Sequence, residues 1–170
     1  MIRAVTARGP ARPVARDISE LSVLLQFGEL VVAIAAQRVA HIVLADEAVA
    51  VAGAVPSVRV GDAVLPAWEL GKLLGLVGPP AAWLVMTTSD EPGAPRIALG
   101  TGPCLAIATH AEVSPLPDGV VTAPPAAVTG VFATDPALRA RGAGQLAIQI
   151  DPMRLIGWSV LAGGARRGER

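Results

Sequence analysis

The sequence predicts an all-β protein built from short strands. Ten short runs of aliphatic and β-branched residues are separated by glycine, proline or aspartate, which is typical of strands joined by close turns. With 170 residues, 52% of them hydrophobic and 16% charged, and a mean hydropathy of +0.54, the chain is too apolar to remain disordered and long enough to bury a core. Many short strands with close turns indicate a barrel or a sandwich.

Turn residues divide the chain into these runs. Phe27-Gly28-Glu29 and Val60-Gly61-Asp62 resemble tight hairpin connections, because glycine adopts the positive φ angle that such turns need. The ten expected strands are Leu21–Phe27, Leu30–Ala36, Ala48–Ala54, Val58–Val60, Ala63–Ala67, Trp83–Thr87, Arg96–Leu99, Cys104–Thr109, Val128–Ala133 and Gln145–Ile150.

Two segments predict short helices. The first, at 69–75, has leucines at helical spacing and can end at Gly75. The second, at 152–156, can be capped by Asp151 and begins with Pro152, whose fixed φ angle suits the first helical position. We expect helix to be confined to these two places.

The two helical segments also match each other at an offset of 82 residues. Each follows a strand, which indicates two related halves at about 18–76 and 82–157, unless short aliphatic strands resemble each other by chance. Both halves belong to one folded unit at 18–160, between arginine-bearing tails at 1–17 and 161–170. The matched pairs are Glu69 with Asp151, Lys72 with Arg154, Leu73 with Leu155, Leu74 with Ile156 and Gly75 with Gly157.

Charge and aromatic content argue against nucleic-acid binding. The net charge is zero, but residues 17–165 carry seven basic and thirteen acidic side chains, a balance of −6 that the ends offset. Two Phe, three Trp and no Tyr offer few rings for bases to stack on. We therefore expect no nucleic-acid partner.

The apolar runs are too short for a membrane. Leu30–Ala36 falls far below the roughly 18 residues that suggest a membrane-spanning helix, so no insertion is expected. The first sixteen residues carry four arginines but no apolar run, and therefore lack the hydrophobic centre of a secretory signal. The expected location is cytoplasmic.

No pattern of the sequence predicts catalysis. A nucleophile with its base would have to come from Cys104 with His41 or His110, but Cys104 lies in an apolar strand, where burial raises the pKa of a thiol and makes it inert. A single cysteine can form neither an internal disulfide nor a multi-cysteine metal site. Nucleophile-elbow, zinc-protease, phosphate-loop and dinucleotide patterns are absent from the sequence. We expect no enzyme activity, no cofactor and no metal.

Three segments carry a family pattern. The opening LLQFGELVVAIAAQRVAHIV (Leu24–Val43) combines a hairpin with the apolar pair Val39 and Ile42. VGDAVLPAWELGKLLGL (Val60–Leu76) holds a strand, a proline, an acidic residue and an LLG helix. VTGVFAT, followed by GQLAIQIDPMRLI (Gly144–Ile156), resembles a final hairpin that ends in an "LDP…L" motif. Together they resemble the CheW-like domain of bacterial chemosensory arrays.

This resemblance implies two small five-stranded β-barrel subdomains that share a core, with two short helices and no active site. Domains of the family join the regulatory domain of a CheA-type histidine kinase to the cytoplasmic tip of a chemoreceptor. They use barrel surfaces for the kinase and an apolar groove between the barrels for the receptor. The implied function is a non-catalytic adapter, and further CheW-like domains are possible partners.

One position departs from the family pattern. Members usually carry N-L-R-G just before the strand and proline, and the arginine contacts kinase and receptor. Counted back from Pro66, this chain has Arg59, Val60, Gly61 and Asp62 there, with Gly61 at the place of the arginine. Arg59 lies on the same strand face but about 7 Å away. The alternative function is therefore a divergent scaffold without kinase coupling, which self-associates or binds another helix or barrel.

The predicted partner surface is the edge that runs from Arg59 to Pro66, together with the apolar groove between the barrels. Apolar groups that flank the Gly-Asp turn would be left at this edge. Neighbouring side chains of a strand point to opposite faces, and the sequence leaves open whether Val64 or Leu65 faces outward. The predicted partner-binding residues are Arg59, Val60, Gly61, Asp62, Val64, Leu65, Pro66 and Trp158.

Overall fold

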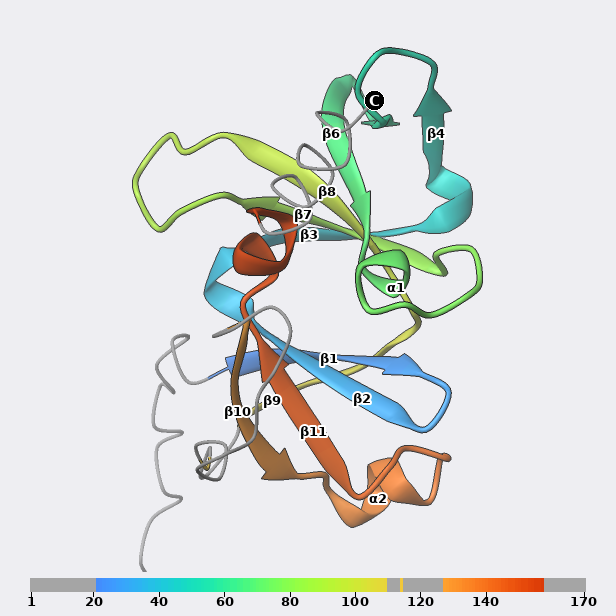
Figure 1. The fold of residues 1–170 in the computed structure, drawn as a ribbon, viewed down its shortest axis with the longest axis vertical. Coiled ribbons are helices and arrows are strands. Elements are labelled where there is room, and N and C mark those ends of the chain that lie inside the picture. The colour runs from blue at the N-terminus through green and yellow to red at the C-terminus, as the bar shows by residue number, and fades with distance from the viewer. Residues whose placement is uncertain (1–20, 110–113, 115–126, 158–170) are drawn as a thin grey trace, which may run out of the picture.

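The structure, a computed structural model, describes residues 21–109, 114 and 127–157. Within these residues, eleven strands form two sheets, which Figure 1 shows as two lobes, one above the other. The prediction of an all-β fold with two subdomains is confirmed. The predicted tails at 1–17 and 161–170 lie outside the described residues.

Each sheet combines strands from both parts of the sequence. The lower sheet of Figure 1 has the order β10-β11-β2-β1-β9, and the upper sheet has the order β3-β7-β8-β6-β5-β4. The lower strands are β1 (Leu21–Phe27), β2 (Leu30–Ala35), β9 (Cys104–Thr109), β10 (Val128–Ala133) and β11 (Leu146–Ile150). The upper strands are β3 (Val39–Leu44), β4 (Ala48–Val51), β5 (Ser57–Val60), β6 (Ala63–Glu69), β7 (Ala82–Thr87) and β8 (Arg96–Thr101).

Three details differ from the sequence prediction. Strand β3 was not expected, so the upper sheet has six strands and not five. Strand β4 ends at Val51 and not at Ala54. A further helix, α2 (Pro136–Arg139), follows β10 because the Oδ1 atom of Asp135 accepts a hydrogen bond from the N–H of Ala137 at 2.7 Å and caps it.

The upper sheet curls back toward its own first strand. Its two edge strands, β3 and β4, are joined only by the 3₁₀ turn Ala45–Glu47, and such a turn rises only about 2 Å per residue. The N–H of Leu44 donates to the Oε2 atom of Glu47 at 3.2 Å and fixes the turn. Strands β3 and β4 therefore act as one bent strand, which pairs with β7 along its first part and with β5 along its second.

The lower sheet closes in a different way. Ser114, which follows β9, exchanges two backbone hydrogen bonds with Val131 of β10, at 2.8 and 2.9 Å. Strands β9 and β10 are the two edges of the sheet, so this bridge places a residue that follows one edge strand against the other edge strand. Both sheets are thus strongly curled.

Four strands bury both of their faces. Strands β1, β2, β7 and β8 direct alternate side chains into a shared core between the sheets, and the remaining side chains into a second core within each curl. The shared core contains Val23, Leu25, Val32, Ile34, Leu70, Leu84, Met86, Ile97, Leu99, Ala127, Ile150, Leu155 and Ile156. The upper core contains Val58, Leu65, Ala67, Trp83, Val85 and Ala98, and the lower core contains Leu24, Val31, Ala33, Leu138, Ala143 and Ala147.

Glycines allow the tight turns and the crossing between sheets. Gly28 and Gly61 have φ angles of +62° and +57° in the two predicted hairpin turns, as expected. At Gly102 the chain passes from the upper to the lower sheet, and a Cβ atom there would overlap the carbonyl oxygen of Gln26. The N–H of Gln26 donates to the carbonyl oxygen of Pro103 at 2.9 Å, which holds this crossing in place.

Both predicted helices are present. Helix α1 (Leu70–Leu73) follows β6, and Gly75 has a φ angle of +73° just beyond it. Residues 152–157 form a helical segment after β11. It is capped by Asp151, whose Oδ1 atom accepts a hydrogen bond from the N–H of Met153 at 3.0 Å.

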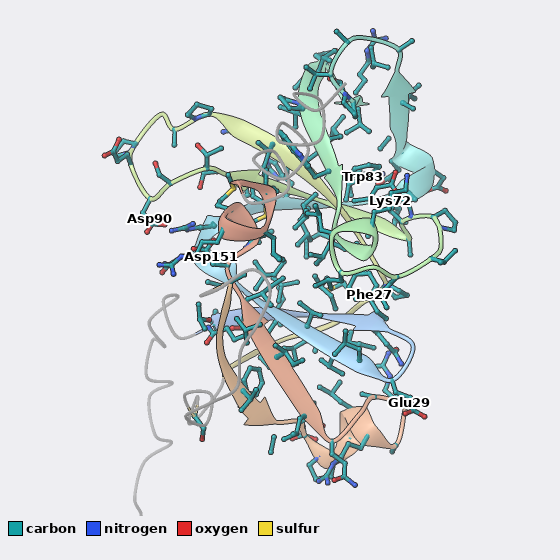
Figure 2. All side chains as sticks on the ribbon, in the orientation of Figure 1. Phe27, Glu29, Lys72, Trp83, Asp90 and Asp151 are labelled. Atoms are coloured by element: carbon teal, nitrogen blue, oxygen red, sulfur yellow. The ribbon has the colours of Figure 1, made fainter. Side chains whose placement is uncertain are left out.

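A charged cluster connects the two sheets at one side. Arg38 lies between β2 and β3, and its Nε atom is 3.1 Å from the Oδ1 atom of Asp90 in the β7–β8 connection. Its Nη1 atom is 3.7 Å from the Oδ1 atom of Asp151. Figure 2 shows Asp90 and Asp151 on the same side of the molecule, where the lobes meet. Asp151 also forms an ion pair with Arg154, with 3.5 Å between the Oδ2 and Nε atoms.

The shared core should dominate the free energy of unfolding. Leu99 is 0% exposed there, so Leu99→Ala should lower this free energy by about 2–5 kcal/mol, through lost burial and a residual cavity. Leu146 on β11 is 57% exposed, and Leu146→Ala should cost about 0.5 kcal/mol or less. Urea unfolding followed by circular dichroism measures both values. Equal losses would contradict the shared core.

Candidate partner-binding surface

Strands β4, β5 and β6 form an antiparallel ribbon with one face toward solvent. Val49 on β4, Arg59 on β5 and Val64 on β6 lie opposite one another in the register. Val49 is 61% exposed, Val64 is 50% exposed, and Arg59 between them is also exposed. We call these three residues the outer row.

The inner face of the same ribbon belongs to the upper core. Leu65, next to Val64, is only 8% exposed and packs with Val58, its partner in the register. The structure therefore resolves which residue faces outward. Val64 points to solvent, and Leu65 stabilises the fold.

The turn between β5 and β6 contains only Gly61 and Asp62, because Val60 pairs directly with Ala63. Both turn residues are exposed, and no atom of another part of the chain lies within 4 Å of a Cβ atom built at Gly61. Space does not exclude a side chain at Gly61, but its φ angle of +57° does not suit one.

The remaining predicted residues differ in exposure. Val60 is half-buried and packs against the upper core. Pro66 is exposed on the outer face, two residues beyond Val64. Trp158 lies outside the described residues. The ribbon thus brings Arg59, Val64 and Pro66 to one face.

A groove of about 420 Å³ lies beside this ribbon. Ala50 and Val51 of β4 line one side, Lys72 and Leu73 of α1 line another, and Trp83 lies among the buried lining residues. Figure 2 shows Trp83 and Lys72 close together in the upper lobe. The full lining of the groove is Ala50, Val51, Pro56, Ser57, Val58, Ala67, Trp68, Glu69, Lys72, Leu73 and Trp83.

The groove is mostly apolar and locally neutral. Two indoles and several aliphatic side chains line it. Its charged groups, Lys72 and Glu69, form an i,i+3 ion pair, with 2.8 Å between the Nζ and Oε1 atoms. Sequence reasoning missed this groove because its lining comes from five separate elements.

Cys104 does not form a reactive site with His41. The thiol is partly buried on β9 of the lower sheet. Burial raises its pKa above the ordinary value of a cysteine, although a backbone hydrogen bond from Ala106 lowers the pKa by a smaller amount. His41 is exposed on β3 of the upper sheet, and His110 lies outside the described residues. Within the described part of the chain, no three His, Cys, Asp or Glu side chains could hold a metal ion.

The fold and the surface define a two-lobed β protein with an exposed apolar ribbon. Its fold is CheW-like: the structure is similar to the crystal structure of the scaffolding protein TtCheW from Thermoanaerobacter tengcongensis, with a TM-score of 0.58 and 15% sequence identity. The similarity covers 78% of this chain and 89% of that chain. The fold expected from the family resemblance is confirmed.

No protein-family profile and no curated protein sequence matches the chain. The likeness is therefore one of fold. Among the described residues, no helix has the length and apolar character needed to cross a membrane.

Burial should also control the chemistry of Cys104. Because its pKa is raised, less thiolate is present at a given pH, and alkylation by iodoacetamide should be slower in the native protein than in the urea-unfolded chain. The pH at which the rate is half-maximal should be higher in the native state. Alkylation rates measured across the alkaline range give both values. Faster native alkylation at neutral pH would contradict an inert thiol.

Proposed function

We propose that this protein is a non-catalytic adapter that couples a chemoreceptor to a CheA-type histidine kinase in a chemosensory or motility complex. The CheW-like fold supports this proposal, since a protein of the same fold is a scaffolding protein. The observation that carries it is the outer row, which leaves two valines around one arginine on a solvent-facing sheet. The adapter acts in the cytoplasm.

The outer row has the composition of a small interface centre. Val49 and Val64 supply apolar area, and burial of such area contributes about 25 cal/mol per Å². Arg59 lies between them and can donate several hydrogen bonds to a carboxylate of a partner. The partner surface also includes Val60, Gly61, Asp62, Pro66 and Trp158.

The row is held rigidly, which lowers the entropy cost of binding. A two-residue turn fixes the register of β5 and β6, and Leu65 anchors the ribbon in the upper core on the opposite face. In this proposal the kinase regulatory domain contacts the ribbon, and the receptor tip contacts the predicted apolar groove between the two lobes, which is distinct from the groove beside the ribbon.

A second function is a divergent scaffold without kinase coupling, which self-associates or binds another helix or barrel. The φ angle of +57° at Gly61 favours it, because an arginine at this turn would adopt a left-handed conformation that costs about 1–2 kcal/mol. The conformation of the hairpin turn therefore favours glycine over arginine at position 61. Arg59 carries the nearby positive charge in either function.

A charge in the outer row should abolish partner capture. Val64→Glu places a carboxylate in the centre of the proposed contact and should weaken binding by at least about tenfold, while the melting temperature stays close to that of the native protein. Calorimetric titration against the regulatory domain of a CheA-type kinase measures the affinity.

Two further variants control this experiment. Leu146→Glu carries the same new charge at an exposed residue of the lower sheet and should bind normally. Leu65→Glu buries a charge in the upper core and should unfold the domain. If Val64→Glu binds as tightly as Leu146→Glu, the partner surface lies elsewhere.

The residue at position 61 separates the two functions. For the kinase adapter, Gly61→Arg should strengthen binding to the kinase regulatory domain by several-fold relative to Gly61→Ala, which carries the same backbone strain without the charge. The same titration measures both variants. Equal affinities, together with concentration-dependent association of the native chain in sedimentation, would support the self-associating scaffold instead.

A further inference from the structure

We propose that the free edge of β4 and the neighbouring groove form a second binding site, which takes an extended peptide segment as an added antiparallel or parallel strand. The peptide would carry large apolar side chains at alternate positions. This site is separate from the outer row and does not depend on the proposed function.

The hairpin turn determines which backbone groups of β4 are free. In a two-residue turn the flanking residues, Val60 and Ala63, exchange hydrogen bonds, so the N–H and C=O groups of Val60 point toward β6. The N–H of Ala67 donates to the carbonyl oxygen of Pro56 at 2.8 Å. This bond agrees with the alternation, in which residues 56, 58 and 60 all direct their backbone polar groups toward β6.

The backbone N–H and C=O groups of β4 alternate in direction in the same way. Arg59 must point its backbone groups toward β4, where they meet Val49. Ala50 is next along the strand, so its N–H and C=O groups point away from β5. In the described part of the chain, β4 pairs with β5 alone, and Ala50 has no other backbone partner.

This edge lacks the usual protection against strand addition. Proteins guard exposed edges with charged side chains, prolines or bulges. Strand β4 reads Ala-Val-Ala-Val, without a charge or a proline, and its pairing with β5 is regular. A strand could therefore be added at Ala50 without removing any backbone hydrogen bond that the described residues make.

The groove lies where the side chains of an added strand would point. Ala50 lines the groove together with Val58, its partner in the register, so this face of the ribbon opens into it. In an added strand, every second side chain would face the same way. A volume of about 420 Å³ accommodates large side chains at two alternate positions, against Trp68 and Trp83.

An extended peptide fits this site better than a helix. A helix satisfies its own backbone groups and cannot pair with the free N–H and C=O of Ala50, whereas an added strand bonds to both. The ion pair of Lys72 with Glu69 at the rim is neutral, so the selected side chains should be apolar. The predicted recognition combines backbone hydrogen bonds for affinity and groove contacts for specificity.

The test uses a synthetic peptide of alternating pattern, acetyl-Lys-Thr-Phe-Thr-Leu-Thr-Glu-amide, titrated into the full chain with tryptophan fluorescence as the readout. We expect saturable binding with a dissociation constant below about 1 mM. A second peptide, N-methylated at every residue from the phenylalanine to the last threonine, keeps all side chains but lacks the N–H groups that would pair with the edge of β4 in either strand direction. It should bind at least about tenfold more weakly.

Variants of the chain locate the site. Ala50→Pro removes the free N–H, and proline is tolerated on the open side of an edge strand, so the fold should persist while peptide affinity falls at least about tenfold. Ala50→Ser keeps the N–H and should bind within about twofold of the native chain. Val64→Glu should leave peptide binding unchanged, which separates this site from the kinase surface.

Either of two results of the peptide titrations would overturn the proposal. One is the absence of saturable binding below about 1 mM for the alternating peptide. The other is equal affinity of the Ala50→Pro and Ala50→Ser variants, or of the two peptides, since binding would then not use the edge of β4. Self-association that Ala50→Pro abolishes, without any peptide binding, would assign the edge to a second copy of this chain and would also overturn it.

Discussion

The packing of two curled sheets against one shared apolar core constrains the rest of the molecule. Strands β1, β2, β7 and β8 contribute to this core with one set of alternate residues and to the core of their own sheet with the other. Such strands must be apolar on both faces, which accounts for uninterrupted runs such as Leu30–Ala35 and for a mean hydropathy of +0.54. The crossing at Gly102 is tight because the sheets must remain this close.

Much of the fold could be predicted because local chemistry marks its turns and helix ends. Gly28 and Gly61 signal hairpins through the positive φ angles that they adopt, and Asp151 signals a helix cap. Strand β3 was missed because no glycine or proline marks either of its ends: Ala36–Arg38 precedes it, and the turn Ala45–Glu47 that follows it has Asp46 as its one turn-forming residue. Helix α2 has a cap at Asp135, but four residues are too few to show helical periodicity.

The candidate binding surface was only partly predictable, because its orientation depends on residues that are distant in the sequence. Alternation along β6 requires Val64 and Leu65 to face opposite ways, but the choice between them is made by Trp83 and Ala98, which cover the inner face of the ribbon. These two residues come from β7 and β8, which follow α1 in the sequence, whereas β6 precedes it. The groove depends on even more elements, so no single segment of the sequence carries its pattern.

The ribbon of β4, β5 and β6 is where the shared-core arrangement leaves apolar surface uncovered. Strands β1, β2, β7 and β8 are covered on both faces, whereas the ribbon buries only its inner face and, among the described residues, ends in the unpaired edge of β4. Exposed valines such as Val49 and Val64 add nothing to the cores of the isolated chain and favour edge pairing and aggregation unless another molecule covers them. A sheet with one face anchored in a core and the other exposed is also rigid, so a partner would bind it with little loss of conformational entropy. The constraint that builds the core therefore also determines where apolar surface remains available for the proposed partner.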